Sequence, residues 1–354
     1  MTSRAGLSAA PALAKAEFEA QLAAYRTRVI SLIREAIPDR EPQKHLYAIV
    51  SEQLSNEGKG IRPALCLASC RALGGSEDRA LPSAAALELL HNAFLVHDDI
   101  EDESDFRRGL PTLHQKFGTA LAINAGDAMN AMGIRLLRQN LSRLGPELSR
   151  RIFDEFDHLS IETIEGQAME LGWIRDNDCA TTEEDYLLMV LKKTGWYSFI
   201  HPMRIGALVA APDRTDLDSF NRFGYFLGAA FQIQDDVLNL TGDQQRYGKE
   251  IGGDLLEGKR TLILTHAFAH SEPHEKQRLK AFLAKPRAQR FPRELAWVQA
   301  LVRARGSIEY ARRAARQFAE GARREFEAAY GTAAPGAALN FIERLLDYLV
   351  SRDK

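Results

Sequence analysis

The sequence predicts an all-α fold. Apolar residues recur at intervals of three and four along most of the 354 residues, which is the spacing of one face of a helix. No stretch alternates apolar and polar side chains as a half-buried strand does. The segments with helical periodicity are roughly 14–36, 60–73, 80–104, 115–140, 146–171, 182–211, 216–241, 255–270 and 306–350.

Local signals mark several ends of these helices. Pro82 lies near a helix start, and Thr215 followed by Asp218 resembles a capping box. Gly242 stands where the helix over 216–241 should end, because glycine readily adopts the backbone conformation that follows a helix.

The length and composition allow one large core. With 354 residues, 45% hydrophobic and 27% charged, the chain lies near the size at which single cores begin to divide. The segment 284–293, AKPRAQRFPR, is a polar connector with two prolines, but too little sequence follows it for a second catalytic domain. We expect a single domain over 14–354, preceded by a disordered segment over 1–13.

Charge and cysteine content exclude several kinds of partner. The formal net charge of −2 provides no general attraction for nucleic acid or anionic lipid. Cys66, Cys70 and Cys179 are odd in number and lack partners at zinc spacing, which favours reduced thiols. The N-terminus lacks the apolar core of a secretory signal, and no uncharged apolar stretch is long enough to span a membrane. We expect a cytoplasmic protein without a membrane span.

Two acidic clusters are the most informative motifs, DDIED at 98–102 and QDDVLN at 234–239. Asp98 and Asp102 lie on one helical face, where like charges repel by about 4 kcal/mol at an effective dielectric constant of 20. A bound cation removes this cost. A few hard oxygen ligands, with room for phosphate oxygens and water, suit Mg²⁺ better than Zn²⁺. The sequence thus predicts two facing acidic helices that bind a diphosphate through magnesium.

The helix with the first cluster has the pattern of a pocket wall. His91, Phe94, Leu95, Asp98 and Asp102 recur at three or four spacing, so one face changes from apolar to anionic within two turns. Such a face suits a substrate with a hydrocarbon tail and a charged head. A helix end that enters solvent explains the same acidic residues.

Basic residues accompany the clusters. Arg107 and Arg108 follow the first cluster, where guanidinium groups can bind phosphate oxygens in a bidentate manner, although a plain surface pair has the same sequence. Lys59 and Arg62 stand in GKGIRP at an expected helix start, and helix N-termini favour anions. Exposed helix ends also commonly carry such residues.

The second cluster has the same design. In FQIQDDVLN, Gln232 and Asn239 lie about one turn before and one turn after Asp235. Between the clusters, a glycine in KKTGWYS interrupts a helical stretch and either permits a local kink or packs in the core. The other polar residues of these motifs are Lys193 and Thr194 in KKTGWYS and Lys249, Asp254 and Lys259 in GKEIGGDLLEGKRT.

The ordered set of motifs resembles the trans-isoprenyl diphosphate synthases, the short-chain polyprenyl synthetases. The motifs are GKGIRP, HNAFLVHDDIED with RRG, KTGWYS, FQIQDDVLN and GKEIGGDLLEGKRT, and the resemblance covers about residues 40–350. It implies an all-helical bundle around a central cavity, usually as a homodimer. It also implies that isopentenyl diphosphate is joined head-to-tail to an allylic diphosphate, which is dimethylallyl, geranyl or farnesyl diphosphate.

The resemblance also implies roles for individual residues. Those expected to bind three Mg²⁺ ions are Asp98, Asp102 and Asp235, with support from Asp99 and Asp236. Those expected to hold the allylic diphosphate are Arg107, Lys193, Lys249 and Lys259. Those expected to hold isopentenyl diphosphate, in a metal-free site, are Lys59, Arg62, His91 and Arg108. The groups expected to present negative dipoles to an allylic cation are Thr194, Gln232 and the carbonyl of Lys193.

Two positions depart from the family pattern. Asn239 replaces an aspartate of many relatives, which removes a charge but keeps an oxygen that can accept a hydrogen bond or bind a metal. Gly60 stands where relatives often carry arginine, so a peripheral contact to isopentenyl diphosphate is lost. We expect activity to survive.

Product length depends on residues near the first cluster. Phe94 lies one turn before Asp98, about 6 Å away along the helix, where its ring would obstruct a growing chain. Ala93 beside it leaves room. The family pattern associates bulky residues here with short products, so we expect geranylgeranyl diphosphate first and farnesyl diphosphate second.

Other classes of protein share part of this pattern. A class I terpene cyclase would use a first aspartate cluster with magnesium but would carry an N…S/T…E motif in place of QDDVLN. A non-catalytic partner subunit would have lost one cluster or its cations. Head-to-head condensation would not require Lys59, Arg62 and His91. The presence of both clusters with their cations favours the head-to-tail enzyme.

Overall fold

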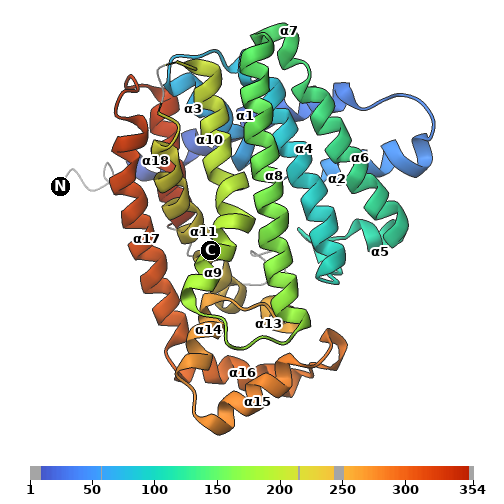
Figure 1. The fold of residues 1–354 in the computed structure, drawn as a ribbon, viewed down its shortest axis with the longest axis vertical. Helices are drawn as coiled ribbons and strands as arrows, with labels where there is room; N and C mark the ends of the chain where they lie inside the picture. Colours follow the sequence, from blue (N-terminus) through green and yellow to red (C-terminus); the bar gives the residue numbers. More distant parts are fainter. Residues whose placement is uncertain (1–8, 57, 214–215, 243–250, 351–354) are drawn as a thin grey trace, which may run out of the picture.

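The computed structural model describes residues 9–56, 58–213, 216–242 and 251–350. Figure 1 shows long helices that run side by side, with shorter helices across one end. Within these residues strands occur only in one hairpin, in which β1 (Phe106–Arg107) pairs antiparallel with β2 (Leu110–Pro111). The prediction of an all-α fold is confirmed.

The helices of the first half of the chain are α1 (Ala9–Ala36), the π-helix η1 (Gln43–Tyr47), α2 (Ala48–Ser55), α3 (Ile61–Ala72), α4 (Glu77–Glu101), α5 (Leu113–Phe117), α6 (Thr119–Leu137), α7 (Asn140–Leu144) and α8 (Pro146–Arg175). Those of the second half are α9 (Glu183–Val190), the π-helix η2 (Leu191–Ile200), α10 (His201–Ala210), α11 (Ser219–Thr241), α13 (Gly253–Glu257), α14 (Leu262–Ala269), α15 (Pro273–Leu283), the 3₁₀-helix η3 (Arg287–Gln289), α16 (Pro292–Ala304), α17 (Ser307–Tyr330) and α18 (Ala337–Val350).

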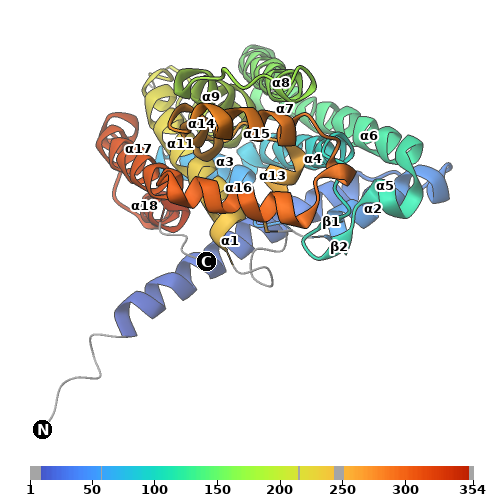
Figure 2. The same ribbon diagram turned by 90° about the horizontal axis from the view of Figure 1, so that it is seen from below.

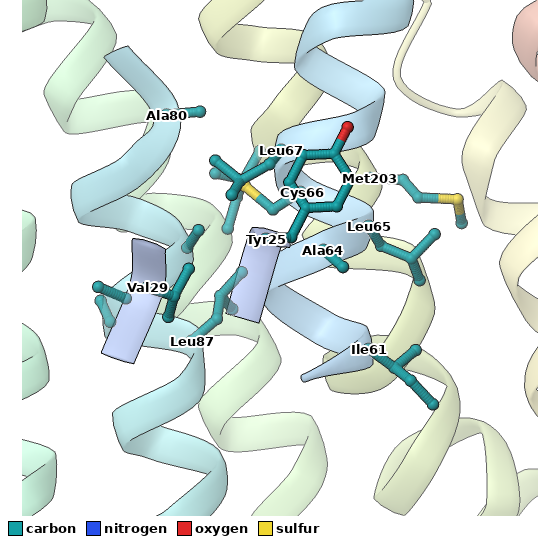
Figure 3. Packing of buried hydrophobic residues seen from close by; sticks show 14 of the residues in the cluster. Tyr25, Val29, Ile61, Ala64, Leu65, Cys66, Leu67, Ala80, Leu87 and Met203 are labelled. Carbon is teal, nitrogen blue, oxygen red and sulfur yellow. The ribbon is translucent and has the colours of Figure 1, made fainter. Parts of the chain in front are cut away.

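Buried apolar side chains form two clusters along the bundle. Part of the larger one is shown in Figure 3, where Tyr25 and Val29 of α1 lie near Cys66 of α3, Leu87 of α4 and Met203 of α10. The smaller one lies among α9, α14, α15 and α16, and of these α15 and α16 lie across the lower end of the bundle in Figure 1 and nearest the viewer in Figure 2. Helices α11 and α17 contribute side chains to both clusters and so connect them.

Two helix boundaries follow the predictions only in part. Helix α4 begins at Glu77, so Pro82 lies inside it and not near its start. A proline leaves the carbonyl four residues earlier without its helical donor. Here that carbonyl, of Asp78, accepts a hydrogen bond from Arg143 Nη1 at 3.4 Å. Gly242 follows the end of α11 as predicted.

The capping prediction for α11 falls partly outside the described residues, because Thr215 is not among them. The helix starts at Ser219, and the side chain of Asp218 before it makes no capping hydrogen bond. At the other end of the chain, the periodic segment 306–350 divides into α17 and α18. The predicted helix over 255–270 likewise divides into α13 and α14, and the turn between them contains Lys259.

Several short helices lie in segments that sequence periodicity did not identify. These are η1 and α2 before residue 56, and α15 before the polar connector. The connector itself contains η3 and the start of α16. Helix α1 begins at Ala9, so residues 9–13 are helical although disorder was expected there.

Two further expectations concern the whole chain. All three cysteines are free thiols; Cys66 and Cys70 are buried, whereas Cys179 is only partly buried although a buried thiol was expected there. None of the helices in the described residues is both long and apolar enough to pass through a lipid bilayer.

Candidate active site

Both acidic clusters face one cavity of about 750 Å³ between α4, α8, η2 and α11. Asp98 reaches it from α4, and Asp235 and Asp236 reach it from α11. The predicted site residues that line this cavity are Lys59, Arg62, His91, Phe94, Asp98, Arg107, Arg108, Lys193, Thr194, Gln232, Asp235, Asp236 and Lys259.

The remaining predicted residues lie elsewhere. Asp99 and Asp102 are buried next to the lining, 3% and 8% exposed, and each forms an ion pair with a cation that lines the cavity. Ala93 is 2% exposed and packs in the core without lining the cavity. Lys249 lies outside the described residues.

The first acidic cluster is surrounded by cations. Arg107 donates from Nη2 to Asp98 at 3.0 Å and from Nε to Asp99 at 2.6 Å. Lys193 Nζ lies 3.5 Å from the other oxygen of Asp98. Burial, together with the charge of Asp98, raises the pKa of Asp102 to about 7.

Lys259 is the closest cation to the end of this cluster. Its Nζ lies 2.6 Å from Asp102 Oδ2 and 2.8 Å from Glu257 Oε2. Burial alone would lower the pKa of Lys259, but the charges of Asp102 and Glu257 raise it well above its usual value. The ammonium group therefore stays charged where a phosphate group would meet it.

Hydrogen bonds connect the second acidic cluster to η2. Thr194 Oγ1 donates to Gln232 Oε1 at 3.0 Å, and Gln232 Nε2 donates to Asp236 at 2.9 Å. Tyr186, a buried residue of α9, donates to the other oxygen of Asp236 at 2.7 Å. Burial raises the pKa of Asp236 to about 7, although both hydrogen bonds oppose this shift.

Asn239 has a structural role in this region. It is 2% exposed, and its Oδ1 accepts a hydrogen bond from the backbone N–H of Asp254 at 3.2 Å. Its own carbonyl accepts from the N–H of Gly252 at 2.7 Å. The side chain thus joins the end of α11 to the first turn of α13. Asn239 replaces an aspartate of many relatives, and the side-chain oxygen that it keeps acts here as a hydrogen-bond acceptor.

The basic residues of the second predicted substrate site lie at the start of α3. Arg62 donates to Tyr197 Oη at 2.6 Å and to Ser198 Oγ at 2.8 Å, and it lies 4.3 Å from the centre of the Tyr197 ring. Arg62 Nη1 lies 3.2 Å from His91 Nε2. Because arginine has no acceptor, Nε2 must accept this bond. Burial and the charge of Arg62 lower the pKa of His91 well below its usual value, so the imidazole is neutral.

A buried carboxylate faces the same arginines. Glu88 lines the cavity, is 5% exposed, and lies one turn before His91 on α4. Burial raises the pKa of Glu88, while the charges of Arg62 and Arg108 oppose the shift. Sequence analysis did not identify Glu88, although its i, i+3 spacing from His91 places both on one helical face.

The hairpin directs the side chains of two adjacent arginines to different parts of the site. Arg108 and Gly109 both have positive φ, 54° and 78°, as the two central residues of the tightest hairpin turns require. Arg107 points to Asp98 and Asp99, whereas Arg108 donates to the carbonyl of Asn56. The turn therefore divides one sequence motif between the two predicted diphosphate sites.

The KTGWYS motif lies in the π-helix η2. The backbone N–H of His201 bonds to the carbonyl of Trp196, which is the i to i−5 pattern of this helix type. A Cβ atom on Gly166 of α8 would lie 2.3 Å from the backbone nitrogen of Lys193, and one on Gly228 of α11 would lie 3.0 Å from Gly195 Cα. Gly195 of the motif thus lies in a helix of altered period and also packs closely against α11. Sequence analysis had offered a local kink and core packing as alternatives.

Two other polar residues complete the site without a sequence signal. Glu170 of α8 is 6% exposed and forms a short ion pair with Lys193. Tyr186 of α9 holds Asp236. Each is one of several polar residues in its helix, and only the packing of the bundle brings it to the cavity.

The carboxylates provide some, but not all, of the ligands that a hard divalent cation needs. Asp102 and Asp236 have raised pKa values because burial makes their negative charge unfavourable, and a nearby divalent cation would remove this penalty. Among the described residues, no three acidic, histidine or cysteine side chains are grouped closely enough to hold a metal ion on their own. Phosphate oxygens and water would complete the coordination, as they do for Mg²⁺ at sites that bind substrate phosphates.

Comparison with known proteins adds independent findings. Residues 43–296 match the family model for polyprenyl synthetase. The geranylgeranyl pyrophosphate synthase of Geoglobus acetivorans is 35% identical over 91% of this chain and 95% of its own length. The solved structure of geranylgeranyl pyrophosphate synthetase from Pyrococcus horikoshii has a TM-score of 0.85 and 31% identity, over 96% of this chain and 99% of that one.

A further solved structure contains ligands. It is geranylgeranyl pyrophosphate synthase from Corynebacterium glutamicum in complex with isoprenyl diphosphate and magnesium. Its TM-score to this chain is 0.82 at 26% identity, over 95% of this chain and 99% of that one. The likeness extends over nearly the whole length of both chains.

Proposed function

This chain belongs to the polyprenyl synthetase family, and from that membership we propose that it condenses isopentenyl diphosphate head-to-tail with an allylic diphosphate to give geranylgeranyl diphosphate. It is an enzyme that transfers prenyl groups. The observation that supports this activity best is the convergence of both acidic clusters on one cavity that also carries two separate sets of cations. The names of the relatives favour geranylgeranyl diphosphate over farnesyl diphosphate.

The two cation sets correspond to two diphosphates. Arg107, Lys193 and Lys259 lie beside the aspartates and would hold the allylic diphosphate, together with Lys249. The set at the start of α3 would hold isopentenyl diphosphate and consists of Lys59, Arg62, His91 and Arg108. In the second set, Arg62 donates to the hydroxyls of Tyr197 and Ser198 and Arg108 donates to the carbonyl of Asn56, which suits a site without metal.

The aspartates are the expected metal ligands. Asp98 and Asp102 would hold two Mg²⁺ ions and Asp235 a third, with Asp99 and Asp236 in supporting positions. When bound, Mg²⁺ supplies positive charge that stabilises the departing diphosphate. The complex of the Corynebacterium glutamicum relative with isoprenyl diphosphate and magnesium supports magnesium as the cofactor.

The remaining residues of the cavity protect and orient the reacting groups. The lysine and arginine side chains neutralise charge on the leaving diphosphate, so the allylic C–O bond can break without a protein nucleophile. Thr194, Gln232 and the carbonyl of Lys193 direct negative dipoles at the allylic cation while the double bond of isopentenyl diphosphate attacks. The proton that is then lost passes to the released diphosphate. The apolar lining excludes water, which would otherwise trap the cation as an alcohol.

The activity is tested by incubating the protein with labelled isopentenyl diphosphate and with dimethylallyl, geranyl or farnesyl diphosphate in turn. We expect a twenty-carbon diphosphate from each primer when Mg²⁺ is present, and no product after chelation. Chromatography of the dephosphorylated products measures chain length. Cyclic hydrocarbons released from a primer alone would instead identify a terpene cyclase, and a chain that binds without turnover would identify a non-catalytic partner subunit.

Phe94→Ala is expected to lengthen the product. Phe94 lines the cavity one turn before Asp98, and its ring packs edge-on against Tyr197 with centroids 5.7 Å apart. Removing the ring opens the space into which the tail grows, so products beyond twenty carbons should accumulate. Phe106→Ala is the control, because Phe106 is 60% exposed and does not line the cavity. An unchanged product distribution for Phe94→Ala would show that another residue ends the chamber.

Assembly and location complete the proposal. We propose one domain over 14–354, because α11 and α17 belong to both apolar clusters. We propose a homodimer, because α6 and α8 expose large apolar side chains such as Ile134 and Ile161, 46% and 50% accessible. Sedimentation at assay concentrations tests that assembly. Free thiols agree with a reducing compartment, the cytoplasm.

A further inference from the structure

We propose that the connector between α15 and α16 positions Lys259 for the allylic diphosphate. Arg287 of the connector acts on Lys259 through Glu257. Arg290 acts through the turn that contains Lys259. The residues between the two helices are 284–291, the part of the polar connector 284–293 that precedes α16, and their sequence gave no sign of a role in the site. The inference rests on the proposed function, because the position of Lys259 matters only if a diphosphate binds there.

Arg287 acts through one shared carboxylate. Glu257 accepts from Arg287 Nη1 at 3.2 Å on one oxygen and contacts Lys259 Nζ at 2.8 Å with the other. Lys259 Nζ in turn lies 2.6 Å from Asp102. The four side chains form a continuous chain of alternating charge from the connector to the first acidic cluster, and Lys259 is only 13% exposed within it.

This arrangement controls how strongly Lys259 is held. An ammonium group between two carboxylates is attracted by both, and a diphosphate must compete with them for it. Arg287 neutralises part of the charge of Glu257 and so weakens that competition. Without Arg287, the full charge of Glu257 would act on Lys259 and oppose binding of the substrate.

Arg290 fixes the backbone next to Lys259. It is 7% exposed and donates to the carbonyls of Leu256 at 2.7 Å and Leu283 at 2.8 Å, at the C-terminal ends of α13 and α15. Carbonyl groups at helix ends lack partners within the helix, so a buried arginine that satisfies them holds both ends together. A Cβ atom on Gly258 would lie 2.8 Å from the Arg290 guanidinium, which shows how closely that group packs on the turn.

The backbone of the turn is fixed from the other side as well. Gly258 has a φ of 79°, a conformation that favours glycine, and the N–H of Lys259 bonds to the carbonyl of Asp254 at 2.9 Å. Arg260, 3% exposed, donates to the carbonyl of Asp178 at 2.8 Å and to Asn177 Oδ1 at 2.8 Å. Lys259 therefore projects from a turn that is anchored at both neighbouring residues.

The decisive variant is Arg287→Ala, because Arg290→Ala removes several backbone contacts and can prevent folding. We expect Arg287→Ala to raise the KM for the allylic diphosphate by roughly tenfold, the lower end of the roughly 10- to 100-fold cost of losing an outer partner that orients a binding group. The KM for isopentenyl diphosphate should stay unchanged. Arg287→Lys should recover most of the loss, because it restores the charge next to Glu257.

The sign of the effect of Glu257 makes the test specific. If Arg287 acts by neutralising Glu257, then Glu257→Gln in the Arg287→Ala background should lower the allylic KM again. Lys285→Ala is the matched control, since Lys285 lies in the same connector and pairs with Glu294 at 2.6 Å, away from Lys259. Equal effects of Arg287→Ala and Lys285→Ala, or equal increases of both KM values, would overturn the proposal.

Calorimetry separates this inference from the proposed function. Binding of inorganic pyrophosphate with Mg²⁺ needs no turnover, and Arg287→Ala but not Lys285→Ala should weaken it about tenfold. If the wild-type protein forms no prenyl product, but Arg287→Ala still binds pyrophosphate more weakly than the wild type and Lys285→Ala do, the proposed condensation fails while the role of the connector stands. If the enzyme is active and pyrophosphate binding is the same in all variants, the role of the connector fails alone.

Discussion

Asp98→Asn is expected to lower kcat about a thousandfold, the cost of removing a preorganised charged group from a reaction that develops charge. Asp98 lines the cavity, and its oxygens contact both Arg107 and Lys193. Asparagine keeps the shape of the side chain but removes the negative charge, and a carboxamide is a much weaker ligand than a carboxylate for a hard divalent cation. The fold should persist, because the amide oxygen can still accept from Arg107, and both cations keep a second carboxylate partner, Asp99 for Arg107 and Glu170 for Lys193.

Steady-state kinetics at saturating substrates measure this loss, and the thermal unfolding midpoint checks the fold. Asp154→Asn is the control, because Asp154 is a surface residue of α8 that pairs only with Arg150 among the described contacts. Wild-type turnover of Asp98→Asn would mean that the first acidic cluster does not take part in ionising the substrate.

Lys193→Met should reduce kcat/KM for the allylic substrate by roughly a hundredfold to a thousandfold, as loss of a direct cation contact to a leaving group does. Lys193 lies between Asp98 and Glu170, and burial alone would lower its pKa, but the charges of Glu170 and Asp98 raise it. Methionine fills the same volume without the charge. Because Glu170 is 6% exposed, loss of its partner should also destabilise the fold by roughly 2 to 3 kcal/mol.

The matched control is the adjacent lysine. Lys192 pairs with Glu162 at 2.9 Å and Glu165 at 2.6 Å on α8 and does not line the cavity. Lys192→Met should therefore retain nearly full activity. Urea unfolding measures the stability of both variants, and steady-state kinetics with varied allylic diphosphate measure activity. Similar losses for the two variants would indicate a general electrostatic effect in place of contact with the substrate.

The pair Lys192 and Lys193 illustrates what sequence can predict about this site. The KKTGWYS motif marks both positions, but a helix with a changed period rotates its faces, so periodicity does not tell which lysine enters the cavity. The acidic clusters were easier to interpret, because the spacing of Asp98 and Asp102 places them on one face of a helix. Whether the two clusters share one cavity depends on long-range packing, which only the structure describes.

Apart from Glu88, the site residues that sequence analysis missed share a physical reason. Glu170, Tyr186 and Glu257 each act through a partner that lies far away in the chain or on a turn, and none stands in a recognisable local pattern. The helices α2 and α15 were missed because they are short, with 8 and 11 residues, so too few apolar positions recur to reveal the helical period. The helix start predicted near Pro82 was wrong, because α4 continues through the proline, and the carbonyl that loses its helical donor accepts a hydrogen bond from Arg143.

The contact of Phe94 with Tyr197 has a consequence for engineering product length. The same tyrosine contacts Arg62 with its ring and its hydroxyl, so the residue that we propose to limit the hydrocarbon chain touches the residue that orients a cation of the proposed isopentenyl diphosphate site. Enlarging the chamber at position 94 would therefore also remove support from that site. Phe94→Ala should therefore give longer products and weaker binding of isopentenyl diphosphate together. A variant that lengthens the product without weakening that binding would have to replace the contact of the Phe94 ring with Tyr197 rather than delete it.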